Sequence, residues 1–185
     1  MSTFRDGRSA RWSPPSRLPR RRLPAGAEGW LTSTDSLTRR VAEACGGAGF
    51  RVALLGQRRV RPREDERRLL GMGRGEQALL REVFLMCGST PWVYARTVIP
   101  LRSLRGGLRR LAHLGERSLG SVLFADPATR RERVEYGALA GADAPAGARH
   151  DAALWGRRSV FVLRGRRLLV SEFFLPVVWE GRREN

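Results

Sequence analysis

The sequence contains no lysine, because all 35 of its basic residues are arginine. Lysine forms catalytic Schiff bases, anchors pyridoxal phosphate and completes the phosphate-binding P-loop, so these three kinds of site are excluded. Histidine is nearly as scarce, and His113 and His150 are too few for a histidine-based metal centre. Cys45 and Cys87 also lack metal-ligand spacing. We therefore predict no metal ion, and a reducing cytoplasm is the expected compartment.

Long apolar runs are absent as well. None approaches the roughly 20 residues that cross a bilayer, and the chain does not start with a secretory apolar segment, so we expect no stable membrane insertion. The net charge of +17 would suit nucleic-acid binding. The arginines are spread along the whole chain, however, beside 21 glycines, which is typical of compositional bias. We predict no nucleic-acid partner, although the positive field favours an anionic substrate.

The length of 185 residues and the hydrophobic content of 42% predict one domain between two tails. Residues 1–26 are rich in Arg, Ser and Pro and are predicted to be a disordered basic tail. An organelle transit peptide is an alternative, but the prolines there oppose an amphipathic helix. Residues 27–178 are predicted to form the folded domain, and residues 179–185 a C-terminal tail.

Hydrophobic periodicity predicts hairpins with helical segments between them. This order is typical of an α+β domain in which helices cover one side of an antiparallel sheet. Residues 138–151 are small and show no hydrophobic periodicity, so a loop is expected there. Alternation along 129–136 would place Arg131, Arg133 and Glu135 on one face. Helices are expected within 28–44 and 101–124, and strands at 50–57, 78–87, 92–99, 129–136, 154–163 and 167–175.

Two of these strands each carry one charged residue on an apolar face. Glu172 shares its face with Leu168, Val170 and Phe174, in a strand that ends at Pro176. Arg81, in the strand at 78–87, likewise shares its face with apolar residues. A buried charge needs a partner or a ligand, so we interpret the two as opposite ends of a small pocket. Two alternatives are a direct Arg81–Glu172 ion pair and a register in which Glu172 faces water.

Five segments, in the same order along the chain, resemble the chorismate pyruvate-lyase family. The last of them ends in the letters SEFFLP. The resemblance runs from about residue 31 to residue 176. The segments are residues 35–40, the hairpin residues 80–87 with 91–100, and residues 114–124, 154–159 and 168–176.

This resemblance implies a cofactor-independent lyase that converts chorismate to 4-hydroxybenzoate and pyruvate, the first step toward the ubiquinone ring. It also implies a cytoplasmic monomer with a six-stranded antiparallel sheet, helices packed on one side, and an enclosed ligand pocket. A non-catalytic domain of the same fold that senses small aromatic acids is the alternative. Such a regulator would carry a DNA-binding winged helix, for which the first thirty residues are too short and too rich in proline.

The family's ligand-binding positions fall on four residues of this chain. Arg81 matches the arginine that holds the ring carboxylate, and Glu172 matches the glutamate at the hydroxyl end; both are the expected catalytic residues. Leu37 and Leu119 match residues that close over the ring. Leu37 replaces a common methionine of similar volume, and Ala95 replaces a common glycine, so its methyl group narrows the site. Arg96 is expected either to meet the pyruvyl carboxylate or to form a structural ion pair.

Overall fold

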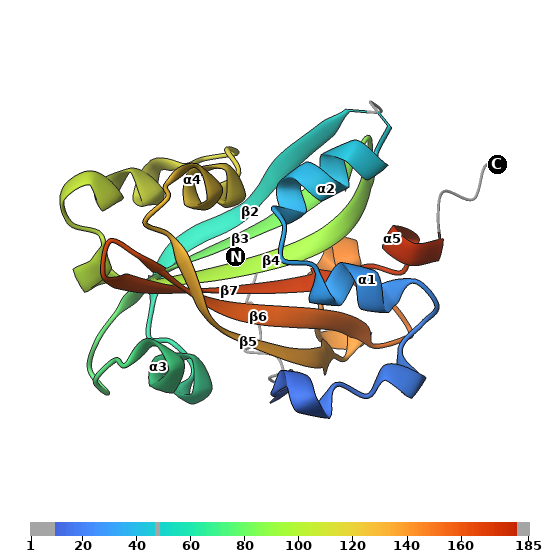
Figure 1. The fold of residues 1–185 in the computed structure, drawn as a ribbon. Coiled ribbons are helices and arrows are strands. Elements are labelled where there is room, and N and C mark those ends of the chain that lie inside the picture. Colours follow the sequence, from blue (N-terminus) through green and yellow to red (C-terminus); the bar gives the residue numbers. More distant parts are fainter. Residues whose placement is uncertain (1–9, 47–48, 181–185) are drawn as a thin grey trace.

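An antiparallel sheet of seven strands forms the centre of the structure, a computed structural model that describes residues 10–46 and 49–180 (Figure 1). The strand order is β1-β5-β6-β7-β4-β3-β2. The α+β class and the antiparallel sheet are therefore as expected, but the predicted count of six strands is wrong. The strands are β1 (Arg11–Ser13), β2 (Phe50–Val60), β3 (Ala78–Cys87), β4 (Thr90–Pro100), β5 (Arg130–Leu139), β6 (Leu154–Leu163) and β7 (Arg166–Phe174).

Both predicted hairpins are confirmed. β3 pairs with β4, and β6 pairs with β7 through a two-residue turn. In that turn Arg164 and Gly165 both have positive φ, 50° and 73°, which matches the right-handed twist of the strands they join. These four strands are adjacent in the sheet, where they are covered on both faces. This is why their sequences read as nearly continuous apolar runs.

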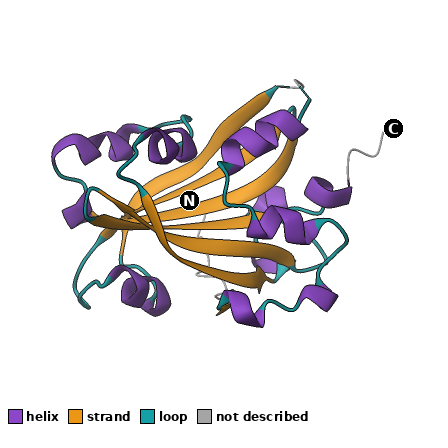
Figure 2. Ribbon diagram, in the orientation of Figure 1, coloured by secondary structure: helices purple, strands orange, loops and turns teal. Residues whose placement is uncertain are grey.

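Helices cover both faces of the sheet, so the prediction of helices on one side is wrong (Figure 2). α1 (Ala27–Thr32), α2 (Leu37–Ala44), α4 (Leu119–Ala125) and α5 (Val177–Glu180) lie on one face, and α3 (Glu64–Leu70) lies on the other. The second face needs cover because it carries its own apolar side chains, and α3 packs there through Leu70 against Leu80 and Leu169. Short 3₁₀ turns fill the remaining connections: Pro15–Arg17, Arg20–Arg22, Leu101–Ser103, Gly106–His113, Gly141–Asp143 and Ala146–Ala148.

The segment at 138–151, expected to be a simple loop, begins as the end of β5 and continues through two 3₁₀ turns onto the second face. Ala148 is buried there, and a side chain at Gly147 would approach the Phe84 ring within 2.9 Å. The small residues that removed any periodic signal are therefore the ones that allow this close packing.

The N-terminal segment is ordered from residue 10 onward, so the prediction of a disordered tail is wrong for residues 10–26. β1 pairs with β5 and supplies the seventh strand. Trp12 packs against Phe173 with ring centroids 5.5 Å apart, and Leu18 is buried in the core. These contacts stabilise a segment whose sequence has little hydrophobic periodicity of its own. Residues 1–9 lie outside the described part of the chain.

The prediction of a C-terminal tail over residues 179–185 is wrong for its first two residues. Trp179 and Glu180 belong to α5, and the Trp179 ring lies 6.3 Å from that of Phe174. The prediction for residues 181–185 falls outside the described residues.

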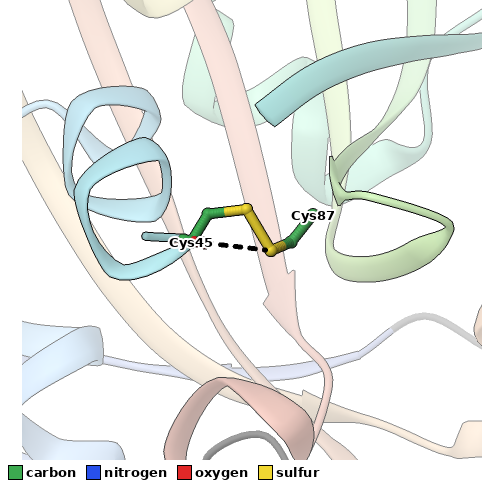
Figure 3. The surroundings of a disulfide bond; sticks show 2 residues. All are labelled: Cys45 and Cys87. Atoms are coloured by element: carbon green, nitrogen blue, oxygen red, sulfur yellow. Dashed lines mark hydrogen bonds between the residues drawn. A yellow bond between two sulfur atoms is a disulfide. The ribbon is translucent and has the colours of Figure 1, made fainter. Parts of the chain in front are cut away.

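Cys45 and Cys87 form a disulfide bond (Figure 3). The bond was not anticipated, because the two residues are 42 positions apart in the sequence. Cys45 follows the end of α2, and Cys87 is the last residue of β3. The bond therefore ties one end of α2 to the sheet. The two cysteines were the reason to expect a reducing cytoplasm. Disulfides are uncommon in reducing compartments, so the bond does not support that expectation.

We expect reduction of this disulfide to destabilise the protein, because the bond closes a long loop in the unfolded chain. The loop-entropy relation gives an upper value of about 4 kcal/mol for the loss in free energy of unfolding. Urea titrations with and without reductant measure it. The double variant Cys45→Ser/Cys87→Ser is the control, since reductant should leave its unfolding curve unchanged. Two free thiols in the purified protein, with no effect of reductant on its stability, would contradict the assignment.

Candidate active site

A pocket lies between the sheet and the N-termini of α2 and α4. The four residues singled out in the sequence, Leu37, Arg81, Leu119 and Glu172, all line it. Its other walls are largely apolar side chains from several strands and from α4. Strand alternation pointed to Arg81 and Glu172, and the family resemblance to Leu37 and Leu119; all four share one pocket although they come from four different elements.

The cover of the pocket is formed where α2 and α4 meet. Leu37 and Leu119 are the first residues of these helices, which follow the N-caps Ser36 and Ser118. The hydroxyl groups of Thr38 and Ser118 are 2.6 Å apart and join the two helices. Gly120 permits this approach, since a Cβ there would lie 2.8 Å from Thr38 Oγ1. Both helix N-termini thus face the pocket, where they favour negative charge.

Two backbone carbonyl groups fix the side chain of Arg81 where it lines the pocket. Its side chain is almost fully buried, and Nη2 donates hydrogen bonds to the carbonyl oxygens of Gly115 and Arg117 at 2.9 and 2.8 Å. Among the described residues, no hydrogen-bond partner is found for the buried Nε. Burial lowers the pKa of Arg81, which reflects the cost of keeping this cation away from water. A buried cation with an unused donor is suited to receive an anion.

Glu172 lies on the same face of the sheet and forms an ion pair with Arg157. The Arg157 Nε donates to Glu172 Oε2 at 2.6 Å, as expected for opposite residues of β6 and β7. No hydrogen bond to Glu172 Oε1 is found among the described residues. Both sequence alternatives are therefore wrong: Glu172 pairs with Arg157 instead of Arg81, and it lines the pocket instead of facing bulk water.

Arg157 also connects the pocket to α1. Its side chain is only 1% exposed, and Nη1 donates to the carbonyl oxygens of Leu31 and Ser33 at 3.3 and 2.5 Å. These carbonyl groups lie at the C-terminal end of α1, where the helix leaves them without internal partners. The sequence analysis did not single out Arg157. Adjacent arginines at 157 and 158 in an apolar strand were a usable signal, because one of them must face inward.

Arg131 is a second pocket residue that the sequence analysis missed. It was expected to share a face with Arg133, but the β5–β6 register shifts between these two residues. Such a bulge changes the face to which side chains point. Arg131 therefore lines the pocket, with its guanidinium carbon 5.2 Å from the centroid of the Phe161 ring.

Arg96 forms the structural ion pair that was one of its two expected roles. It lies on the second face of the sheet, where Nε donates to Glu66 at 2.8 Å and Nη1 lies 3.6 Å from Glu82. Burial alone would lower the pKa of Arg96, but these carboxylates raise it. Burial and the nearby Glu82 carboxylate likewise raise the pKa of Tyr94, which donates to Glu82 at 2.6 Å. Arg96 is therefore not a residue of the pocket.

The pocket combines apolar walls with an excess of positive charge. Among the described residues that line it, three guanidinium groups face one carboxylate, a net of two positive charges: Arg81, Arg131, Arg157 and Glu172. Such a site suits a small, ring-shaped organic acid. In the described ranges, no cluster of three metal-ligating side chains is found, and no helix has the length and apolar character needed to cross a membrane.

Comparison with known proteins places the chain among relatives of one kind. The family model described as chorismate lyase matches residues 8–184. A protein of Aromatoleum aromaticum named "Probable chorismate pyruvate-lyase" is 45% identical over 172 residues, covering 89% of this chain and 92% of the relative. A protein of the same name from Azoarcus sp. is 45% identical over 175 residues, with 89% of each chain covered.

Solved structures show a similar fold at low sequence identity. The effector domain of PhnF from Mycobacterium smegmatis has a TM-score of 0.56 and 14% identity, covering 79% of this chain and 91% of that domain. The ligand-binding domain of a GntR-family regulator from Bordetella bronchiseptica has a TM-score of 0.52 and 18% identity, covering 74% and 92%. These likenesses concern the fold alone.

We expect Arg157→Met to destabilise the protein by about 3–5 kcal/mol, because it leaves the carboxylate of Glu172 without its partner in an apolar pocket. Chemical denaturation measures the loss. Arg130→Met, at an exposed position of β5, is the control and should change stability by no more than about 0.5 kcal/mol. The double variant Arg157→Met/Glu172→Gln should recover part of the loss. An Arg157→Met protein as stable as the wild type would contradict this role.

Proposed function

This chain belongs to the chorismate lyase family, and we propose that its pocket converts chorismate to 4-hydroxybenzoate and pyruvate. The observation that carries the proposal is the placement of Arg81 and Glu172 in one largely apolar pocket. The product bears a carboxylate and a hydroxyl group at opposite ends of a flat ring. A cation at one end and an acid at the other, with apolar side chains between them, complement that shape and charge.

The reaction is an elimination that makes the ring aromatic. The bond between ring carbon C3 and the ether oxygen breaks, the hydrogen on C4 leaves as a proton, and the enolpyruvate released takes up a proton to become pyruvate. Chorismate is a dianion, and each product carries one negative charge. Aromatisation drives the reaction strongly, so the protein contributes mainly orientation and charge placement. On this basis we propose that no cofactor takes part.

Arg81 is proposed to bind the ring carboxylate. Its guanidinium is fixed by two backbone carbonyls, and its unused Nε donor can meet a carboxylate oxygen without any loss of existing hydrogen bonds. Charge-assisted hydrogen bonds of this kind are among the stronger polar contacts in proteins. Leu37 and Leu119 are proposed to pack over the ring and to enclose the pocket when the ligand is bound.

Glu172 is proposed to hold the 4-hydroxyl group and to act as the acid–base residue. Arg157 fixes one of its oxygens, which leaves Oε1 for the substrate. A carboxylate placed at the hydroxyl end lies near C4, the carbon that loses its proton. General acid–base catalysis of this kind contributes about a hundred- to ten-thousandfold in rate.

Further points of the proposal rest on the family resemblance. We propose that the protein acts as a cytoplasmic monomer, that it has no nucleic-acid partner, and that its product enters the ubiquinone ring. The second candidate function is a sensor of small aromatic acids, which the likeness of the fold to the PhnF effector domain and to the ligand-binding domain of a GntR-family regulator favours. A sensor would bind 4-hydroxybenzoate and leave chorismate unchanged.

The test is ultraviolet absorbance after chorismate is mixed with the purified protein. We expect 4-hydroxybenzoate to form, and Arg81→Ala to lower kcat/KM by the equivalent of about 2–5 kcal/mol, as when one partner of a buried charge pair is removed. Arg130→Ala, at an exposed position, should retain the wild-type value. Glu172→Gln should bind 4-hydroxybenzoate nearly as well as the wild type while losing most of its turnover.

Two results would refute the proposed roles. An Arg81→Ala protein with wild-type turnover would remove the carboxylate site. If Glu172→Gln lost product binding and turnover equally, Glu172 would bind the ligand without acting as the acid–base residue. Binding of 4-hydroxybenzoate without any chorismate turnover by the wild type would favour the sensor.

A further inference from the structure

We infer that Arg131 binds the second carboxylate of the substrate, the one carried by the enolpyruvyl group. This inference rests on the proposed function and extends it, because Arg81 and Glu172 account for the ring alone. Chorismate differs from 4-hydroxybenzoate mainly in the enolpyruvyl group, so a residue that recognises this group selects the substrate over the product.

The position of Arg131 in the sheet fits the shape of the substrate. The order β5-β6-β7-β4-β3 places Glu172, on β7, two strands from Arg81 and two strands from Arg131, on opposite sides. The register sets Arg81 level with Val170 and Arg131 level with Leu168, two and four residues along β7 from Glu172. With strands about 4.8 Å apart and about 3.3 Å per residue, the backbones of Arg81 and Arg131 lie roughly 12 and 16 Å from that of Glu172, and both long side chains reach the pocket. In chorismate the enolpyruvyl ether is attached at C3, next to the carbon that bears the hydroxyl group. Its carboxylate therefore lies to one side of the line from Arg81 to Glu172, and Arg131 lines the pocket from the side of the sheet opposite to Arg81.

Arg131 is also the pocket arginine with the fewest partners. Within the described ranges, no carboxylate lies within ion-pair distance of its guanidinium, and its hydrogen bond is a long one of 3.4 Å to the Ser33 carbonyl. Arg157, by contrast, is committed to Glu172 and to the end of α1. The guanidinium carbon of Arg131 lies over the Phe161 ring at 5.2 Å from its centroid, a cation–π contact that uses none of its N–H donors.

The charge of the pocket supports the same assignment. Its net of two positive charges matches the dianionic substrate, whereas either product alone balances only one of them. Burial lowers the pKa of Arg131, and the neighbouring Arg157 lowers it further. A bound carboxylate would relieve both of these unfavourable effects. The excess cation on the Glu172 side of the pocket is Arg131, since Arg157 is neutralised by its ion pair.

A purely structural role is the rival explanation. Arg131 packs on Phe161 and contacts Ser33 in the segment between α1 and α2, and a residue that only held this segment in place would make the same contacts. A structural residue would affect substrate and product alike. A residue that binds the enolpyruvyl carboxylate would affect the substrate alone, and this difference decides the experiment.

The experiment compares chorismate turnover with 4-hydroxybenzoate binding in Arg131→Gln. We expect kcat/KM for chorismate to fall about thirtyfold or more, the loss typical for removing one partner of a buried charge pair, while the Kd of 4-hydroxybenzoate in a calorimetric titration changes less than about twofold. Arg131→Lys keeps the positive charge but lacks the planar guanidinium with its paired N–H donors, so it should recover part of the turnover. Arg133→Gln, two residues away on the other face, is the matched control and should match the wild type in both measurements.

Two outcomes would overturn the inference: unchanged turnover in Arg131→Gln, or a loss of product binding as large as the loss of turnover. Intact product binding also shows that the variant is folded. Failure of the proposed function itself has a different signature, since the wild-type protein would then leave chorismate unchanged.

Discussion

The ion pair between Arg157 and Glu172 is the interaction on which the rest of the pocket depends. An isolated carboxylate on an apolar strand face would be costly, and Arg157 offsets that cost from the neighbouring strand. The same guanidinium donates to carbonyl groups at the end of α1, just before the segment that leads into α2. One buried cation thus orients the acid on the floor of the pocket and anchors the chain that forms its cover.

The two faces of the sheet use charge in different ways. On the second face, Arg96 and Tyr94 are matched by the carboxylates of Glu66 and Glu82, so that this network satisfies itself. Among the described residues of the pocket face, cations exceed acids, and no partner is found for a buried donor of Arg81. Matched charges stabilise the fold on the second face, whereas the unmatched charges of the pocket are the feature that supports the proposed anion site.

Strand alternation was sufficient to predict the hairpins, and with them the shared pocket of Arg81 and Glu172; the family resemblance added Leu37 and Leu119. Arg131 could not be predicted, because a bulge in β5 moves it to the face opposite the one that alternation assigns. The partner of Glu172 depends on the register between β6 and β7, which no local pattern contains. The strand β1 is three residues long in a proline-rich segment, and its order comes entirely from contacts with distant residues.

The central claim is that a single ring binds between Arg81 and Glu172. A crystal structure of the protein with 4-hydroxybenzoate tests it most directly. The account predicts the ligand carboxylate beside the Arg81 guanidinium, the hydroxyl group beside Glu172, and the ring packed against Leu37 and Leu119. A ligand bound outside this pocket, or bound in it with the carboxylate at the Glu172 end, would contradict the account.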